Sequence, residues 1–198
     1  MGEKSGLKRS HIIENARRVF AEKGFREVTM QDIVAASNIS RGGLYLHFDN
    51  IEEIFAAVLK AEQESGGSES SESLPADATA SDILALFMKE QKKEILRKKN
   101  SLIIAIYEYY FHMYLNKKKI NPKENIIKQQ FETGVLILEN LIRDGISAGE
   151  FYCEDPRGMA GNIMYTLEGL KVAARTLNIS EAAIDKELLY IMQGLVFE

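Results

Sequence analysis

The stretch covering residues 28–48 constrains the fold more than any other part of the chain. Its sequence, VTMQDIVAASNISRGGLYLHF, predicts two short helices joined by a tight turn. Thr29 and Ser40 are residue types that cap the N-termini of helices, and Asn38 is a type that tolerates the backbone geometry of a turn. The spacing therefore predicts a helix-turn-helix.

The second helix of this pair leaves a polar face outside. Leu44 and Phe48 lie four residues apart and turn inward. An exposed helical turn with an arginine, a tyrosine and a histidine suits entry into a DNA major groove. Paired glycines near a helix start cost about 1 kcal/mol each relative to alanine, which favours a close approach of the backbone to a partner. The alternative is a helical-bundle corner without a DNA role. The outer residues are Arg41, Gly42, Gly43, Tyr45, Leu46 and His47.

Charge is distributed unevenly along the chain. Residues 1–48 hold eight Lys or Arg and five acids, a net charge of +3, and the whole chain carries −4, so residues 49–198 carry −7. Such an asymmetry is expected if only the N-terminal part meets phosphates. The N-terminus has no apolar run typical of a signal peptide, and no stretch approaches the ~20 apolar residues of a membrane span. Cys153 is the only cysteine, which fits the cytoplasm.

Helical periodicity recurs along the whole length, and no strand pattern or internal repeat is found. We therefore expect an all-α protein with a three-helix helix-turn-helix DNA-binding domain over 1–49 and a larger helical-bundle domain for ligand binding and dimerisation over 50–198. The helix over 50–64 connects the two, and the Gly/Ser/Glu-rich segment 65–80 is a loop. The expected helices are 10–24, 50–64, 81–99, 101–115, 123–149, 156–178 and 180–197, besides the two of the helix-turn-helix.

The most apolar of these helices predict an oligomer. The helix over 101–115 is apolar nearly all round and is expected at the centre of the second domain. The helices around 124–148 and 156–178 carry more apolar surface than one small domain needs to bury. A homodimer that pairs these two helices with their symmetry mates in a four-helix bundle would cover it.

Residues 8–60 resemble the tetracycline-repressor (TetR) family of bacterial transcriptional regulators. The resemblance lies in the Ala16-x-x-x-Phe20 run, Gly24-Phe25, Thr29-Met30-x-x-Ile33 and the segment from Ser40 to Phe48. It implies a homodimer whose two helix-turn-helix domains read a near-palindromic operator in double-stranded DNA. It also implies an unidentified small molecule that releases the DNA. No cofactor is implied. The residues that it places at the DNA are Thr29, Gln31, Ser40, Arg41, Gly42, Gly43, Leu44, Tyr45 and His47.

By the same resemblance, Thr29 and Gln31 contact phosphate and Arg41 contacts a base edge or a phosphate. Tyr45 and His47 contact the backbone or thymine methyl groups. Ile51 departs from the pattern, because the family commonly has a phosphate-binding lysine there. Phosphate binding then falls to Lys8, Arg9 or Arg26. Leu46 stands where an aromatic residue or histidine is frequent.

The second half carries an aromatic run with one acid over 107–114. Aromatic faces beside a carboxylate are typical of a box for an organic cation or a flat molecule. A packed core with tyrosine hydroxyls at its edge explains the same run equally well. The candidate pocket residues are Phe87, Met88, Tyr107, Glu108, Phe111, Phe131, Tyr165 and Glu168.

An alternative function is an all-helical enzyme or small-molecule binding protein without a DNA role. It needs a nucleophile or an acid–base pair, and Glu108 and Glu168 are the candidate acids, neither with an evident partner. Cys153 has no histidine near it in sequence, so no catalytic residue is predicted. The three histidines are scattered, and no metal site is expected.

Overall fold

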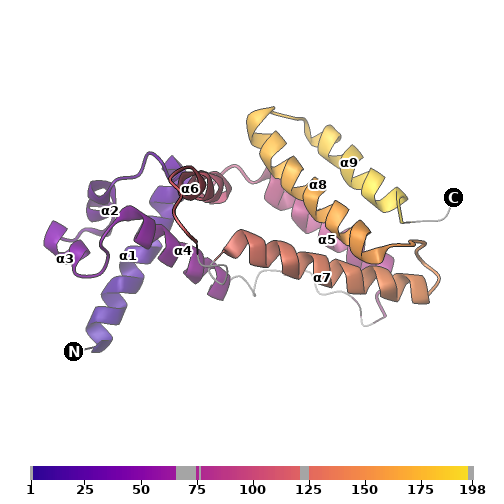
Figure 1. Ribbon diagram of the computed structural model, residues 1–198, viewed down its shortest axis with the longest axis horizontal. Coiled ribbons are helices and arrows are strands. Elements are labelled where there is room, and N and C mark those ends of the chain that lie inside the picture. Colours follow the sequence, from indigo (N-terminus) through magenta and orange to yellow (C-terminus); the bar gives the residue numbers. More distant parts are fainter. Residues whose placement is uncertain (1, 66–74, 76, 121–124, 196–198) are drawn as a thin grey trace. The chain divides into compact units, whose positions relative to one another are not determined.

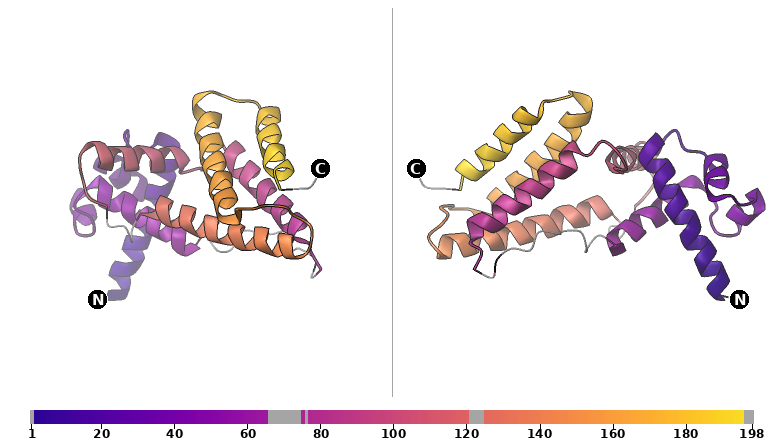
Figure 2. Two further views of the ribbon diagram at one scale, coloured as in Figure 1. Left: turned by 45° about the vertical axis from the view of Figure 1, so that its right-hand side comes forward. Right: turned by 180° about the vertical axis from the view of Figure 1, so that it is seen from behind.

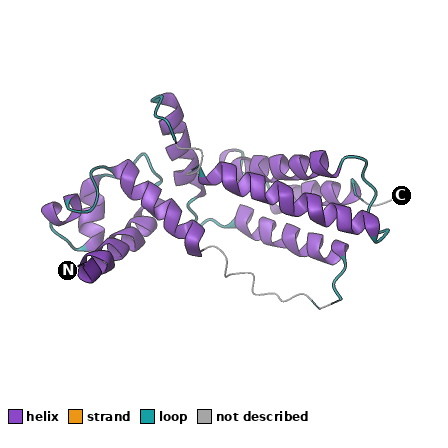
Figure 3. Ribbon diagram, turned by 60° about the horizontal axis from the view of Figure 1, so that its bottom comes forward, coloured by secondary structure: helices purple, strands orange, loops and turns teal. Residues whose placement is uncertain are grey.

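The chain is a helical protein, as the periodicity predicted. The computed structural model describes residues 2–65, 75, 77–120 and 125–195, and these form nine α-helices without a strand (Figures 1 and 3). No helix within these ranges combines the length and apolar character needed to cross a membrane. The prediction of an all-α fold is confirmed.

The first four helices are α1 (Gly2–Lys23), α2 (Met30–Ser37), α3 (Arg41–Tyr45) and α4 (Ile51–Ser65). Gly24 ends α1 in the left-handed region, with φ 79°. The predicted start of α1 at Ser10 is wrong by eight residues. Residues 6–9 are exposed, and an exposed helical turn needs no apolar periodicity, which was the signal for the predicted start.

The remaining helices are α5 (Ala80–Leu96), α6 (Ile103–Leu115), α7 (Ile126–Ser147), α8 (Pro156–Thr176) and α9 (Glu181–Gln193). The predicted cap of α5 at Ser81 is wrong. Thr79 is the N-cap, because its hydroxyl accepts from the Asp82 N–H at 3.1 Å while the Asp82 carboxylate accepts from the Thr79 N–H. The loop predicted over 65–80 falls mostly on residues 66–74 and 76, outside the described residues.

The helices form two compact units. We call them the head unit (Met1–Glu69 and Lys98–Ile126) and the bundle unit (Ser70–Arg97 and Ile127–Glu198). This division differs from the expected one after residue 49, because α4 and α6 both pack in the head unit. In this division α6, expected at the centre of the second domain, contributes to the head core.

The head unit has a core to which α1, α2, α3, α4 and α6 all contribute. Figure 2 shows α1, the longest of these helices, beside α4, and it also contacts α2 and α6. Phe25, just after α1, inserts its ring among Phe20, Phe55 and Tyr109 at centroid distances of 5.2–6.1 Å. The buried members from α4 and α6 are Ile54, Phe55, Val58, Leu59, Ala105, Tyr109 and Met113.

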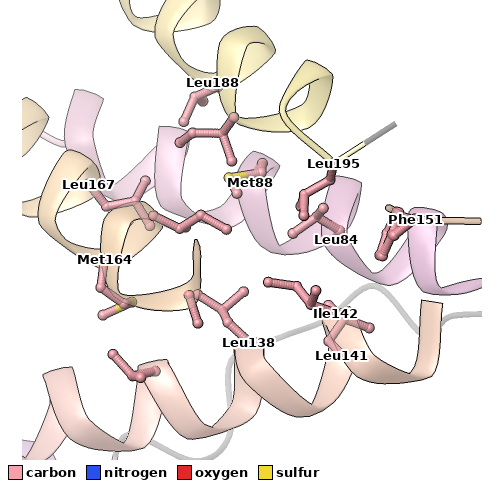
Figure 4. Close-up of a cluster of buried hydrophobic side chains, with 14 of the residues drawn as sticks. Leu84, Met88, Leu138, Leu141, Ile142, Phe151, Met164, Leu167, Leu188 and Leu195 are labelled. Atoms are coloured by element: carbon pink, nitrogen blue, oxygen red, sulfur yellow. The ribbon is translucent and has the colours of Figure 1, made fainter. Parts of the chain in front are cut away.

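The bundle unit has its own core between α5, α7, α8 and α9. Figures 1 and 2 show α8 and α9 side by side, and both contact α5. Side chains from all four helices point toward one another in Figure 4, with Phe151 and Leu195 closing the same end. The labelled members are Leu84, Met88, Leu138, Leu141, Ile142, Phe151, Met164, Leu167, Leu188 and Leu195.

Candidate nucleic-acid interface

The start of α2 is fixed by a complete capping box. The Thr29 hydroxyl accepts from the Asp32 N–H at 3.3 Å, and the Asp32 carboxylate accepts from the Thr29 N–H at 2.8 Å and from the Thr29 hydroxyl at 2.6 Å. The Lys23 ammonium holds the other Asp32 oxygen at 2.6 Å. A phosphate bound here would compete with Asp32 for the Thr29 hydroxyl. Gln31, in the same turn, is exposed.

The Asp32 cap predicts an acid dependence of stability. The hydrogen bond from Lys23, followed by those from Thr29, lowers the pKa of Asp32 from 3.8 to about 2. A carboxyl with a lower pKa in the folded than in the unfolded state stabilises the fold above its unfolded pKa, and this is lost as the pH falls through the folded pKa. Asp32→Asn is therefore expected to lower the free energy of unfolding at pH 7. Urea titrations of both proteins should show the difference shrinking between about pH 4 and pH 2; a constant difference would contradict it.

The turn between α2 and α3 has the predicted chemistry. Asn38 adopts the left-handed conformation, with φ 51° and ψ 46°, and its N–H donates to Ala35. Ile39 follows and packs against the head core. The Ser40 hydroxyl then accepts from the Gly43 N–H at 3.1 Å, which caps α3. Both predicted N-caps of the helix-turn-helix, Thr29 and Ser40, are confirmed.

One face of α3 is anchored and the other is open to solvent. Leu44 is fully buried and Phe48 is 1% exposed, whereas Tyr45 is 42% and Leu46 83% exposed. The Arg41 guanidinium lies over the Tyr45 ring, 5.7 Å from its centroid, so these two exposed side chains form one surface. In Figure 1, α3 lies beside α2 at the edge of the head unit.

Burial corrects one candidate DNA contact. The Leu44 side chain has no exposed surface, so it anchors α3 and cannot reach a DNA base. His47 is half-buried, while Arg41 and Gly42 are exposed. The physical reason is the helical period, which turns Leu44 toward the same side as Phe48.

The paired glycines differ in what they permit. A Cβ at Gly43 would lie 3.1 Å from the Ser40 hydroxyl, so a side chain there would crowd the cap. A Cβ at Gly42 would meet nothing within 4 Å. The cap accounts for Gly43, and Gly42 leaves the backbone of α3 open to a large partner.

Basic side chains stand near the helix-turn-helix. The Arg9 guanidinium lies over the Phe48 ring at 4.7 Å from its centroid. Lys8 and Arg26 are exposed. Ile51 begins α4, and Asn50 caps it by accepting from the Glu53 N–H at 2.9 Å. Arg9 is therefore held against Phe48, at the turn that leads into α4.

The eight candidate pocket residues divide between the two units. Tyr107, Glu108 and Phe111 lie on α6 in the head unit, and the other five lie in the bundle unit. Two cavities of about 530 and 430 Å³ lie within the head unit, and none of the eight residues lines either of them. Phe111 is 64% exposed.

Within the bundle unit, the candidate pocket residues serve packing or face solvent. Met88 is buried in the core. Tyr165 is largely exposed and its ring lies 4.8 Å from that of Phe131. Glu168 pairs with Lys171 at 2.6 Å. Across the described ranges, no group of three or more His, Cys, Asp or Glu gathers as a metal site.

Glu108 caps the turn after α1. Its Oε2 accepts from the Phe25 N–H at 2.6 Å and from the Arg26 N–H at 3.1 Å. A Cβ at Gly24 would lie 2.6 Å from the same oxygen, so this glycine lets the carboxylate approach. Glu108 is therefore a structural residue of the head unit, and its prediction as a pocket acid is not supported by its contacts.

Glu108→Ala is expected to lower the free energy of unfolding by about 1–3 kcal/mol, because two backbone N–H groups lose a charged partner. Glu64→Ala is the matched control, since it removes only a largely exposed i,i+4 ion pair with Lys60 and is expected to cost less than about 1 kcal/mol. Urea unfolding followed by circular dichroism measures both. Equal effects would contradict the assigned role of Glu108.

Comparison with known proteins finds two family matches along the chain. Residues 12–58 match the family described as bacterial regulatory proteins, tetR family. Residues 83–185, more than half of the chain, match the tetracyclin repressor-like C-terminal domain.

Bacterial relatives cover most of the chain. The uncharacterized HTH-type transcriptional regulator YfiR of Bacillus subtilis is 26% identical over 154 residues, which are 78% of this chain and 73% of that protein. YerO of the same species, also described as an uncharacterized HTH-type transcriptional regulator, is 30% identical over 199 residues, 96% of this chain and 64% of that protein. Several relatives matched over shorter segments are named as repressors or negative regulators.

Solved structures share the fold. A transcriptional regulator from Saccharomonospora viridis, crystallised in complex with choline, superimposes with a TM-score of 0.77 at 18% identity over 98% of this chain and 100% of that one. The helix-turn-helix, the helical bundle and both family matches agree. The chain belongs to the TetR family of bacterial transcriptional regulators.

Proposed function

We propose that the protein is a ligand-responsive repressor in the cytoplasm, which binds a palindromic operator as a homodimer and is released by a small molecule. The observation that carries the proposal is α3, a capped helix whose exposed Arg41 and Tyr45 are held outward by buried Leu44 and Phe48. A helix with such a face fits a major groove. Relatives named as repressors support repression as the outcome of binding.

We assign the contacts as follows. Arg41 hydrogen-bonds a base edge, for which guanine O6 and N7 are the best acceptors, and Tyr45 contacts a thymine methyl or the backbone. Gln31 contacts phosphate at the start of α2, where the positive end of the helix dipole favours an anion, and Thr29 does so when the phosphate displaces Asp32 from its hydroxyl. The surface that meets DNA is shaped or flanked by Ser40, Gly42, Gly43 and His47.

The homodimer is supported by exposed apolar side chains in the bundle unit. Leu136 and Ile137 on α7 and Tyr165 and Val172 on α8 all have more than two-fifths of their surface exposed. They fall within the two segments, 124–148 and 156–178, for which pairing is expected. A two-fold interface that buries the same patch on both copies would remove them from water.

The test is selection of bound duplexes from a random pool, followed by titration of the selected duplex at several salt concentrations. We expect a near-palindromic sequence with two half-sites about one helical turn apart. Affinity should fall steeply with salt, as counterions are released from phosphates. Recovery of no preferred sequence by a folded dimer would contradict the proposal.

A further inference from the structure

The cavity of about 430 Å³ in the head unit lies between α4 and α6, beside the N-terminal part of α1. Its floor is apolar and comes from Leu59 of α4 and from Tyr109 and Met113 of α6. Each of these belongs to the head core and has less than a tenth of its surface exposed, so the floor is rigidly held. The volume lies in the range of pockets for small organic molecules.

One wall of the cavity is fixed in place by a backbone hydrogen bond. The Ile126 N–H, at the start of α7, donates to the Tyr110 hydroxyl of α6 at 2.9 Å. Ile126 itself lines the cavity and is buried. The wall therefore keeps its place relative to the floor.

The rim of the cavity is basic. Arg9 from α1, Lys60 from α4 and Lys119 from the segment after α6 all line it, against one carboxylate, Glu53. One Glu53 oxygen already accepts from the Asp49 N–H at 2.8 Å. Three segments far apart in the sequence thus bring three cations to one cavity.

These cations are only weakly engaged within the described part of the chain. Lys60 approaches Glu64 at 3.9 Å, and both side chains are largely exposed, a geometry that contributes little. Arg9 lies over the Phe48 ring, which leaves the edge of its guanidinium able to donate. An anion bound among these groups would offset their mutual repulsion and gain charge-assisted hydrogen bonds.

We propose that this cavity binds an organic anion with one acidic head and an apolar body. The head lies among Arg9, Lys60 and Lys119, and the body covers Leu59, Tyr109 and Met113. The site is in the head unit, and none of the predicted pocket residues lines it. If the proposed function holds, an anion here also weakens DNA binding, because it neutralises positive charge on the unit that meets phosphates.

Two fluorescent probes of similar shape test the site on the full-length protein without DNA, so the outcome is independent of the proposed function. Anilinonaphthalene sulfonate is an anion and phenylnaphthylamine is its neutral counterpart. In the variant Lys60→Ala/Lys119→Ala we expect the dissociation constant of the sulfonate to rise by about tenfold or more, and that of the neutral probe to stay the same. The matched control is Lys98→Ala/Lys186→Ala, two exposed lysines elsewhere, which should bind both probes as the unmodified protein does.

A third variant tests the position of the site. Ala56 lines the cavity from the exposed side of α4, so Ala56→Phe should fill it and weaken the binding of both probes while the melting temperature is kept. The proposal is overturned if the sulfonate binds the double-lysine variant as tightly as the unmodified protein. It is equally overturned if the control pair loses the sulfonate to the same extent, or if Ala56→Phe leaves both probes bound.

Discussion

Replacing Arg41 and Tyr45 together by alanine is expected to lower the affinity for the selected duplex by at least about 100-fold. A bidentate arginine contact discriminates by about 1–3 kcal/mol, and each 1.4 kcal/mol is tenfold in affinity. The two side chains form one exposed surface, with the guanidinium 5.7 Å from the ring centroid. Fluorescence anisotropy of a labelled duplex measures the loss.

The fold of this double variant should be unchanged, because both side chains lie outside the head core. Arg157→Ala/Tyr152→Ala removes the same two residue types from exposed positions in the bundle unit and is the matched control. Analytical ultracentrifugation should find both variants as dimers. If the α3 variant binds as tightly as the unmodified protein, or if the control loses as much, the assignment of α3 as the reading helix is wrong.

Phe25→Ala is expected to lower the free energy of unfolding by about 3–5 kcal/mol, the range for a large core aromatic residue. Phe25 is 3% exposed, and its ring contacts those of Phe20, Phe55 and Tyr109, besides His112 at 5.4 Å. Its removal opens a cavity where α1, α4 and α6 meet. Urea unfolding at pH 7 measures the effect, and DNA binding should be lost with the fold of the head unit.

Phe111→Ala serves as the control for this variant. Phe111 is on α6, close in sequence to Tyr109, but is 64% exposed, so its removal is expected to change stability by about 0.5 kcal/mol or less. Similar losses for the two variants would contradict the placement of Phe25 in the core and Phe111 on the surface.

The helix-turn-helix was predictable because its signals are local. Thr29 and Ser40 cap helices through backbone N–H groups three residues away, and Asn38 takes a conformation that few residue types tolerate. Such contacts depend on a few neighbouring residues. The caps, the turn and the inward side of α3 therefore followed from the sequence alone.

The position of α6 was not predictable in the same way. Its apolar circumference indicated burial, but periodicity does not say which core a helix joins. Glu108 shows the same limit, since its backbone partners at Phe25 and Arg26 lie more than 80 residues away. The aromatic run was therefore equally compatible with a pocket and with a core, and its members divide between core and surface.

The basic cavity escaped sequence analysis for a related reason. Arg9, Lys60 and Lys119 come from three distant segments, and each is an ordinary surface residue in its own segment. Only the packing of α1 with α4 and α6 brings them together. Sequence spacing carries no signal for such a site.

The most direct test of DNA recognition is amide hydrogen exchange of the full-length protein with and without the selected duplex. We predict slower exchange in peptides covering residues 29–32 and 40–48, since these segments would lie against the duplex and lose access to water. Peptides from α9 should exchange at the same rate in both samples. Bound duplex that leaves exchange over residues 40–48 unchanged would contradict the assignment of α3 as the DNA-reading helix.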